Sequence, residues 1–287
     1  MKPIPQKYKG IFCIVISAFG FAVMNTFVRL AGDLPSVQKS FFRNLVAAGI
    51  ALITIIKSGE PVSFNKKYLP LLLVRSIAGT CGILCNFYAV DHLVLADASM
   101  LSKLSPFFTT FFSFLILKER MKWYEIASLI TAFIGMLFVV KPTGTNMNLF
   151  PALIAAAGGL AGGFAYTMVR LLGLRGEKGP KIIFFFSTFS CLSVVPVMIT
   201  DYHPMSTYQI LMLLGAGAAA AVGQFGVTNA YIFAPAREIS IYDYSQILFA
   251  AIMGFFLFGQ LPDALSLIGY VIIIGAAVYS FRKRQAA

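Results

Sequence analysis

The chain carries little charge and few acidic residues, and it has almost no histidine. Its 287 residues include 11 Asp or Glu, 2 His and 1 Trp, and only 12% of them are charged, whereas 59% are hydrophobic. The mean hydropathy of +0.82 is far above what a soluble domain of this length carries. We therefore expect an integral membrane protein.

Motifs for catalysis and metal binding are missing as well. We find no Gly-rich phosphate loop and no pair of histidines at metal-ligand spacing. The four cysteines lie inside apolar stretches, which indicates packing rather than a disulfide framework or a metal site: Cys13, Cys81, Cys85 and Cys191. We expect no enzyme, no cofactor and no metal ion. Without a nucleotide-hydrolysing domain, any uphill transport draws on a gradient.

Apolar stretches long enough to cross a membrane fill the chain. A spanning helix needs about 20 mostly apolar residues. Ten stretches meet this need, five in each half, which predicts an all-α integral membrane protein with ten transmembrane helices. They cover residues 11–32, 37–56, 69–90, 96–117, 123–140, 149–171, 181–200, 207–230, 238–259 and 264–281.

The two halves repeat each other at an offset of 141 residues. The segment Thr26-x-Val28-Arg29-Leu30 recurs as Thr167-x-Val169-Arg170-Leu171, and an arginine at a matched place in apolar helices is hard to obtain by chance. A duplicated unit is therefore expected. Because each unit has an odd number of helices, the second enters the membrane from the opposite side. We expect two inverted five-helix repeats, 8–141 and 149–282, as in carriers that open one site alternately to both faces.

The net charge of +12 bears on orientation. Of the 23 Lys and Arg, 17 fall on one predicted side of the membrane and three on the other: Arg29, Lys39 and Lys141. The side rich in basic residues faces the cytoplasm. Both termini are thus expected in the cytoplasm, with the protein in the cell (inner) membrane and the loop 143–148 outside. The loops are too short for a basic nucleic-acid surface, so we expect no nucleic-acid partner.

A polar stripe marks the fourth helix. Its members recur at helical spacing, so they share one face: Ser99, Ser102, Lys103, Pro106, Thr110 and Ser113. Such a stripe faces the bundle or a water-filled cavity, and an unpaired cation at mid-depth costs about 2.5 to 3.5 kcal/mol. Lys103 therefore needs a partner. Pro106 is expected to kink the helix at Ser102, because it donates no hydrogen bond.

The partner is expected on the ninth helix. The 141-residue offset carries Ser102 to Asp243 and Lys103 to Tyr244. Under a two-fold axis in the membrane plane the two clusters face each other, so Asp243 is the predicted counter-charge of Lys103. Two roles are open: a structural ion pair that joins the halves, or a pair that faces the substrate. Gln246 belongs to the same polar run.

Other polar residues are weaker candidates for a central pocket. Arg75 shares a small, polar face with Gly79, Gly82 and Asn86, so we expect it at the cavity. Arg43 is expected to snorkel to the outer interface or to pack. Asn25 and Tyr166, a pair related by the offset, are expected to line the pocket. The predicted substrate-binding residues are thus Lys103, Asp243, Tyr244, Ser102, Arg75, Asn25, Tyr166 and Gln246.

Several local motifs carry a resemblance to a known family. The segments are Phe42-Arg43-Asn44-Leu45-Val46-Ala47, Leu104-Ser105-Pro106 and Lys118-Glu119-Arg120. With the ten-helix pattern, they resemble the EamA-type transporters of the drug/metabolite transporter superfamily over about residues 8–282. The second half departs from the pattern at Ile247 and Gln260. The resemblance implies secondary transport of a small organic metabolite through a cavity lined mainly by the first, third, fourth, sixth, eighth and ninth helices.

The expected function is therefore a secondary active transporter that works by alternating access in the lipid bilayer. An excess of intramembrane cations over acids favours an anionic or zwitterionic substrate. Two alternatives stay open: a lipid or lipid-phosphate flippase, which a cavity opening sideways to lipid would favour, and a non-transporting membrane scaffold. A homodimer is also left open.

Overall fold

The chain folds into a bundle of helices in the computed structural model, which describes residues 6–118, 122–140, 149–234 and 236–285. These residues form twelve α-helices and one short 3-10 helix, and they contain no strand. The elements are α1 (Gln6–Leu30), α2 (Ser36–Lys57), η1 (Lys66–Tyr68), α3 (Leu69–His92), α4 (Leu95–Ser102), α5 (Ser105–Leu117), α6 (Trp123–Val140), α7 (Leu149–Leu174), α8 (Gly179–Thr200), α9 (Thr207–Phe233), α10 (Ala236–Asp243), α11 (Ser245–Phe258) and α12 (Ala264–Gln285).

Many large apolar side chains of the bundle are exposed. Within the described residues, nine helical segments are long and apolar enough to cross a membrane, and a shorter apolar segment, Ile126–Val139, lies in α6. Large apolar side chains point away from the bundle, such as Phe256 at 77% exposure and Val271 at 73%. Such an apolar surface is unfavourable in contact with water and favourable in contact with lipid. The chain is a multi-pass membrane protein.

Two of the segments are interrupted part of the way along their length. The predicted helix 96–117 is divided into α4 and α5, with Lys103 and Leu104 between them. Pro106 lies in the first turn of α5, where its missing N–H is no loss. The expected kink is thus a helix break. The segment of α10 and α11 is interrupted in the same way at Tyr244, without a proline.

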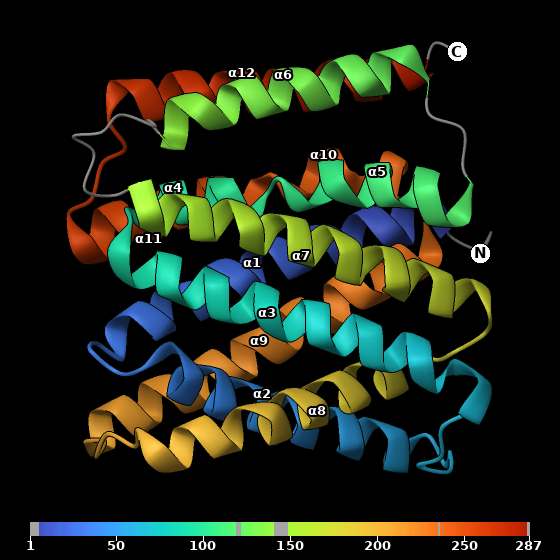
Figure 1. Cartoon of the computed structure of the whole chain (residues 1–287), viewed down its shortest axis with the longest axis vertical. Coiled ribbons are helices and arrows are strands. Elements are labelled where there is room, and N and C mark those ends of the chain that lie inside the picture. The colour runs from blue at the N-terminus through green and yellow to red at the C-terminus, as the bar shows by residue number, and fades with distance from the viewer. Residues whose placement is uncertain (1–5, 119–121, 141–148, 235, 286–287) are drawn as a thin grey trace.

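The helices pack in pairs that run side by side. In Figure 1, α6 and α12 form a pair at one end of the molecule and α2 and α8 a pair at the other, with the remaining helices between them. The most extensive central pairs are α1 with α9 and α3 with α7. The start of α1 and the end of α12 lie at the same edge of the bundle (Figure 1).

Glycines let the central helices approach closely. A Cβ atom added at Gly20 of α1 would lie 2.7 Å from the backbone nitrogen of Gly223 of α9 and 3.0 Å from the carbonyl oxygen of Ala219. Farther along the same crossing, a Cβ at Gly226 would lie 2.7 Å from the Cys13 carbonyl oxygen. In lipid such close contact replaces the hydrophobic effect as the source of helix association.

Candidate functional site

A cavity of about 110 Å³ lies among the central helices. Its wall combines side chains from α1, α2, α3, α5, α7, α9 and α11 with those at the α4–α5 break. Five of the eight predicted site residues line it: Asn25, Ser102, Lys103, Tyr166 and Gln246. A pocket between helices, with polar groups among apolar ones, is the usual form of a small-molecule site in a bundle.

Lys103 and Asp243 form an ion pair at the edge of this cavity. Lys103 Nζ lies 2.8 Å from Asp243 Oδ1, and the side chains are only 6% and 4% exposed. Lys103 follows the last residue of α4, and Asp243 is the last residue of α10. The two helix breaks therefore bring the opposite charges together in a low-dielectric setting, where each needs the other. The predicted counter-charge is the one observed.

Tyr244 and Ser102 both form hydrogen bonds at the break between α4 and α5. The Tyr244 hydroxyl donates to the Lys103 carbonyl oxygen at 3.2 Å, an oxygen that the interrupted helix leaves without its usual backbone partner. Ser102 Oγ donates to the Ser99 carbonyl oxygen at 2.8 Å. Tyr244 thus stabilises the break from the opposite half of the chain, and both breaks are parts of one assembly.

Other parts of the cavity wall are polar as well. Asn86 Nδ2 donates to Asn25 Oδ1 at 3.0 Å, which joins α3 to α1. Tyr166 lines the cavity and stacks on Tyr231, with ring centroids 5.1 Å apart. Gly162 belongs to this wall, and a Cβ there would meet only Ser105 Cβ at 3.5 Å.

Arg75 lies outside the residues that line the cavity, and its guanidinium covers an aromatic ring. Its Cζ is 3.5 Å from the centroid of the Phe186 ring on α8, and the residue is 1% exposed. Arg43 Cζ lies 5.8 Å from the same ring centroid. The two arginines therefore approach one phenylalanine from α2 and α3.

Arg43 packs inside the protein, which was one of the two roles expected for it. Its side chain does not snorkel to the interface, since Arg43 is 1% exposed and lines the cavity. Its Nη1 donates to Asn44 Oδ1 at 2.6 Å, and its Nη2 is 3.5 Å from Gln224 Oε1. Gln224 was missed entirely, because the offset pairs it with the apolar Ile83 and it stands in a run of Gly and Ala. A lone amide in that run is the signal that would have marked it.

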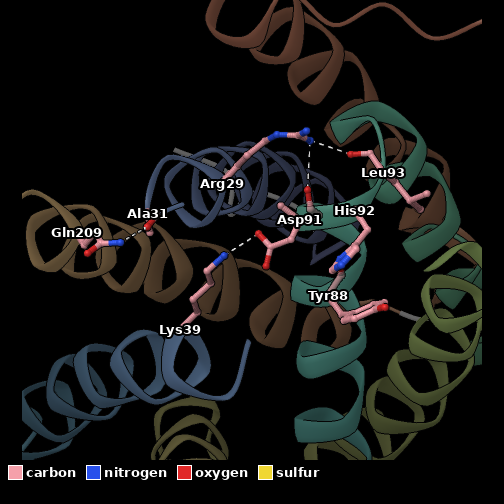
Figure 2. A network of polar contacts seen from close by, with 9 residues as sticks. Arg29, Ala31, Lys39, Tyr88, Asp91, His92, Leu93 and Gln209 are labelled. Carbon is pink, nitrogen blue, oxygen red and sulfur yellow. Dashed lines mark hydrogen bonds and ion pairs between the residues drawn. The ribbon is translucent and has the colours of Figure 1, made fainter. Parts of the chain in front are cut away.

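A second polar network lies one helical turn beyond the cavity, at the predicted outer end. Figure 2 shows Lys39 Nζ pointing at Asp91 Oδ1, 2.6 Å away, and Arg29 donating to the carbonyl oxygen of Leu93 at 2.8 Å. The Arg29 guanidinium also reaches the Val90 carbonyl oxygen at 3.2 Å. The Lys39 side chain is fully buried, so this network joins the ends of α1, α2 and α3 tightly.

A polytopic membrane protein with broken helices around a buried, charged cavity is the architecture of membrane transporters. Comparison with known proteins names the family: residues 8–141 match the EamA-like transporter family. The pseudopaline exporter of Pseudomonas aeruginosa is 31% identical over 96% of this chain and 97% of its own length. The chain belongs to the EamA-type transporters of the drug/metabolite transporter superfamily.

More distant relatives are transporters too. The riboflavin transporter of Brucella anthropi is 25% identical over 94% of this chain and 97% of that protein. Human solute carrier family 35 member G1 is 23% identical over 96% of this chain and 80% of that protein. A solved crystal structure shares the fold, with a TM-score of 0.73 over 98% of this chain and 99% of its own at 13% identity. These names indicate transport rather than catalysis.

Proposed function

We propose that the protein is a secondary active transporter that moves a small anionic or zwitterionic metabolite by alternating access. The observation that carries the proposal is the Lys103–Asp243 pair, which is buried at the cavity where two broken helices meet. Such a pair offers a cation to a carboxylate and an anion to an ammonium group. The named small molecules of the relatives, pseudopaline and riboflavin, agree with a metabolite as substrate.

The proposed binding residues are those predicted above. Ser102, Asn25, Tyr166 and Gln246 line the cavity, and Tyr244 holds the break beside the ion pair. Arg75 does not line the cavity, and its guanidinium group lies over the Phe186 ring.

We further propose two inverted five-helix repeats, 8–141 and 149–282, as the moving units. The helix boundaries support a duplication: α4 and α10 end 141 residues apart, at Ser102 and Asp243, and α6 and α12 start 141 residues apart, at Trp123 and Ala264. Side-chain contacts repeat as well. Arg29 donates to the carbonyl oxygens of Val90 and Leu93 near the end of α3, and Arg170 donates to those of Tyr231 and Ile232 near the end of α9.

The pairing of helices supports an exchange of roles between the halves. At this offset α7 corresponds to α1, and α9 to α3, so the α1–α9 pair and the α3–α7 pair are equivalent. Each broken helix likewise packs against the first helix of the other half, α5 on α7 and α11 on α1. A two-fold relation of this kind allows a rocking motion around the shared cavity.

The network in Figure 2 has the position of an outer gate. Arg29, Lys39 and Asp91 each lie four residues from a residue that lines the cavity: Asn25, Arg43 and Phe87. Residues four apart on a helix lie on one face, so the network covers the cavity on the predicted outer side. Opening to that side requires the Lys39–Asp91 pair to separate.

The orientation is testable by labelling single cysteines in a variant without native cysteines. Asp33→Cys, in the exposed loop between α1 and α2, should react with a membrane-impermeant maleimide in intact cells. Ser63→Cys, exposed between α2 and α3, should react only after lysis, because the basic side of the protein faces the cytoplasm. The reverse pattern would place both termini outside. The loop 143–148 lies outside the described residues.

The test of transport is exchange in proteoliposomes. A thermal-shift screen of the purified protein against a metabolite panel identifies the substrate, and uptake of the labelled compound is then measured with and without unlabelled compound inside. Unlabelled compound inside the vesicles should accelerate uptake of the labelled compound, as expected for one site that faces each side in turn. Lys103→Ala should abolish exchange and binding, since it removes the cation at the cavity.

The control for this experiment is Lys178→Ala, which removes an exposed lysine in the loop before α8 and should leave exchange unchanged. Normal exchange in a folded Lys103→Ala protein would show that the ion pair is structural only. Movement of labelled phospholipid between leaflets, without metabolite exchange, would favour the flippase alternative.

A further inference from the structure

Two buried arginines beside the cavity are left without an acidic partner. Arg43 and Arg75 are each 1% exposed, and no carboxylate of the described residues forms an ion pair with either. Arg75 Nε and Nη1 and Arg43 Nε also lack any hydrogen-bond partner there. Buried guanidinium groups are normally paired or fully hydrogen-bonded, so this arrangement is unusual among the polar groups of the bundle.

The neighbours of the two arginines compensate only part of the cost. Both groups approach the face of the Phe186 ring, at 3.5 and 5.8 Å, and a cation–π contact contributes about 0.5 to 2 kcal/mol. Asn44 and Gln224 offer neutral amide oxygens to Arg43. Arginine stays protonated in proteins, so two like charges remain close together in a low-dielectric region.

The charges around the cavity do not balance. Arg43, Arg75 and Lys103 supply three positive charges, and Asp243 supplies one negative charge, which leaves two positive charges. Arg43 and Lys103 line the same cavity, so one small molecule can reach both. A ligand that neutralises the site carries two negative charges at separate places.

We propose that Arg43 and Arg75 form an anion subsite, and that the substrate carries at least two separated carboxylate groups, one for this subsite and one for Lys103. This inference rests on the proposed transport function and narrows its substrate class. The guanidinium fork suits a carboxylate, since it donates two parallel hydrogen bonds. The donors that are now unpaired would make these bonds: Arg43 Nε from the cavity wall, and Arg75 Nε and Nη1 once the ligand draws the Arg75 side chain off the Phe186 ring.

The first test needs no knowledge of the natural substrate. If the arginines serve a ligand, their repulsion destabilises the empty protein, so Arg75→Met should leave its Tm unchanged or raise it in chloride buffer. If the two arginines stabilise the fold instead, the Tm of the Arg75→Met protein should fall by several degrees. Arg175→Gln, in the exposed turn after α7, is the control for loss of a cation elsewhere.

The second test uses straight-chain dicarboxylates from malonate to pimelate, each beside its monocarboxylate of equal chain length and at equal ionic strength. At saturating concentrations at least one dicarboxylate should raise the Tm of the wild-type protein by about 3 to 5 °C more than its monocarboxylate does. The extra shift should vanish in Arg43→Met and Arg75→Met and shrink in Arg75→Lys, which keeps the charge but loses the fork.

Inorganic phosphate serves as a further probe. An equal shift in Tm with phosphate would show that the subsite takes anions in general, and it would overturn the carboxylate assignment.

Equal shifts for both members of every pair, or a dicarboxylate shift that survives in Arg75→Met, would overturn the subsite. The transport proposal is judged separately by exchange in proteoliposomes. Exchange that proceeds normally in Arg43→Met and Arg75→Met would leave the transporter standing and remove the subsite. A wild-type protein that shows the dicarboxylate shift in Tm but exchanges no substrate would support the subsite and overturn the transport function.

Discussion

Replacing Lys103 by methionine should lower the free energy of unfolding by about 3 to 5 kcal/mol, because it leaves the Asp243 carboxylate buried and unpaired. Asp243→Asn should have a similar effect for the same reason, since the two groups are 2.8 Å apart and almost fully buried. The double variant removes both charges at once. Its loss of stability should therefore be clearly smaller than the sum of the two single losses, as denaturation in detergent can measure.

A surface pair provides the reference for this cycle. Lys178 and Glu60 also form an ion pair, but the Lys178 side chain is 64% exposed. The same cycle with Lys178→Met and Glu60→Gln should give a coupling of no more than about 1 kcal/mol, since water screens exposed charges. If the losses at Lys103 and Asp243 simply add, the two groups are not coupled in the protein, and the central ion pair would have to be abandoned.

Gly20→Ala should destabilise the protein strongly, because the new methyl group would meet the backbone of α9. The added Cβ would lie 2.7 Å from Gly223 N and 3.0 Å from the Ala219 carbonyl oxygen. Backbone atoms in a packed helix pair cannot swing away as a flexible side chain does. The two helices must separate, at a cost of about 1 to 3 kcal/mol or more. The Tm in detergent and the yield of folded protein should both fall.

Gly49→Ala is the matched control. Gly49 lies in the helix α2, and a Cβ added there would have no neighbour within 4 Å. Alanine is intrinsically a better helix former than glycine by about 1 kcal/mol, so this variant should be as stable as the wild-type protein or slightly more stable. A Gly20→Ala protein with an unchanged Tm would mean that α1 and α9 do not cross as closely as described.

Part of the candidate site was predictable because membrane burial makes charge conspicuous. Lys103 and Asp243 stand in apolar segments where an unpaired charge is costly, and the 141-residue offset placed them on corresponding helices. Those two facts were enough to predict that they pair. Tyr244 and Ser102 followed as their sequence neighbours.

Arg43 and Gln224 were not predictable in the same way. Arg43 is one of three basic residues that the sequence assigns to neither side of the membrane, and a sequence does not say whether a long side chain bends to the interface or into a cavity. The answer depends on Gln224 and Phe186, which come from α9 and α8, far along the chain. Their contact with Arg43 exists only when α2, α8 and α9 pack together.

Composition and local motifs were enough to predict an α-helical membrane protein of the EamA type with a charged centre. Hydropathy, periodicity and the cost of buried charge act along a single helix, so they can be worked out from local composition. The tertiary structure alone decided that the fourth helix is broken rather than kinked, that Arg43 faces the cavity and that Phe186 lies beneath two arginines. These features depend on which helices become neighbours, and in lipid that choice follows from close backbone packing at residues such as Gly20 and Gly223 rather than from local pattern.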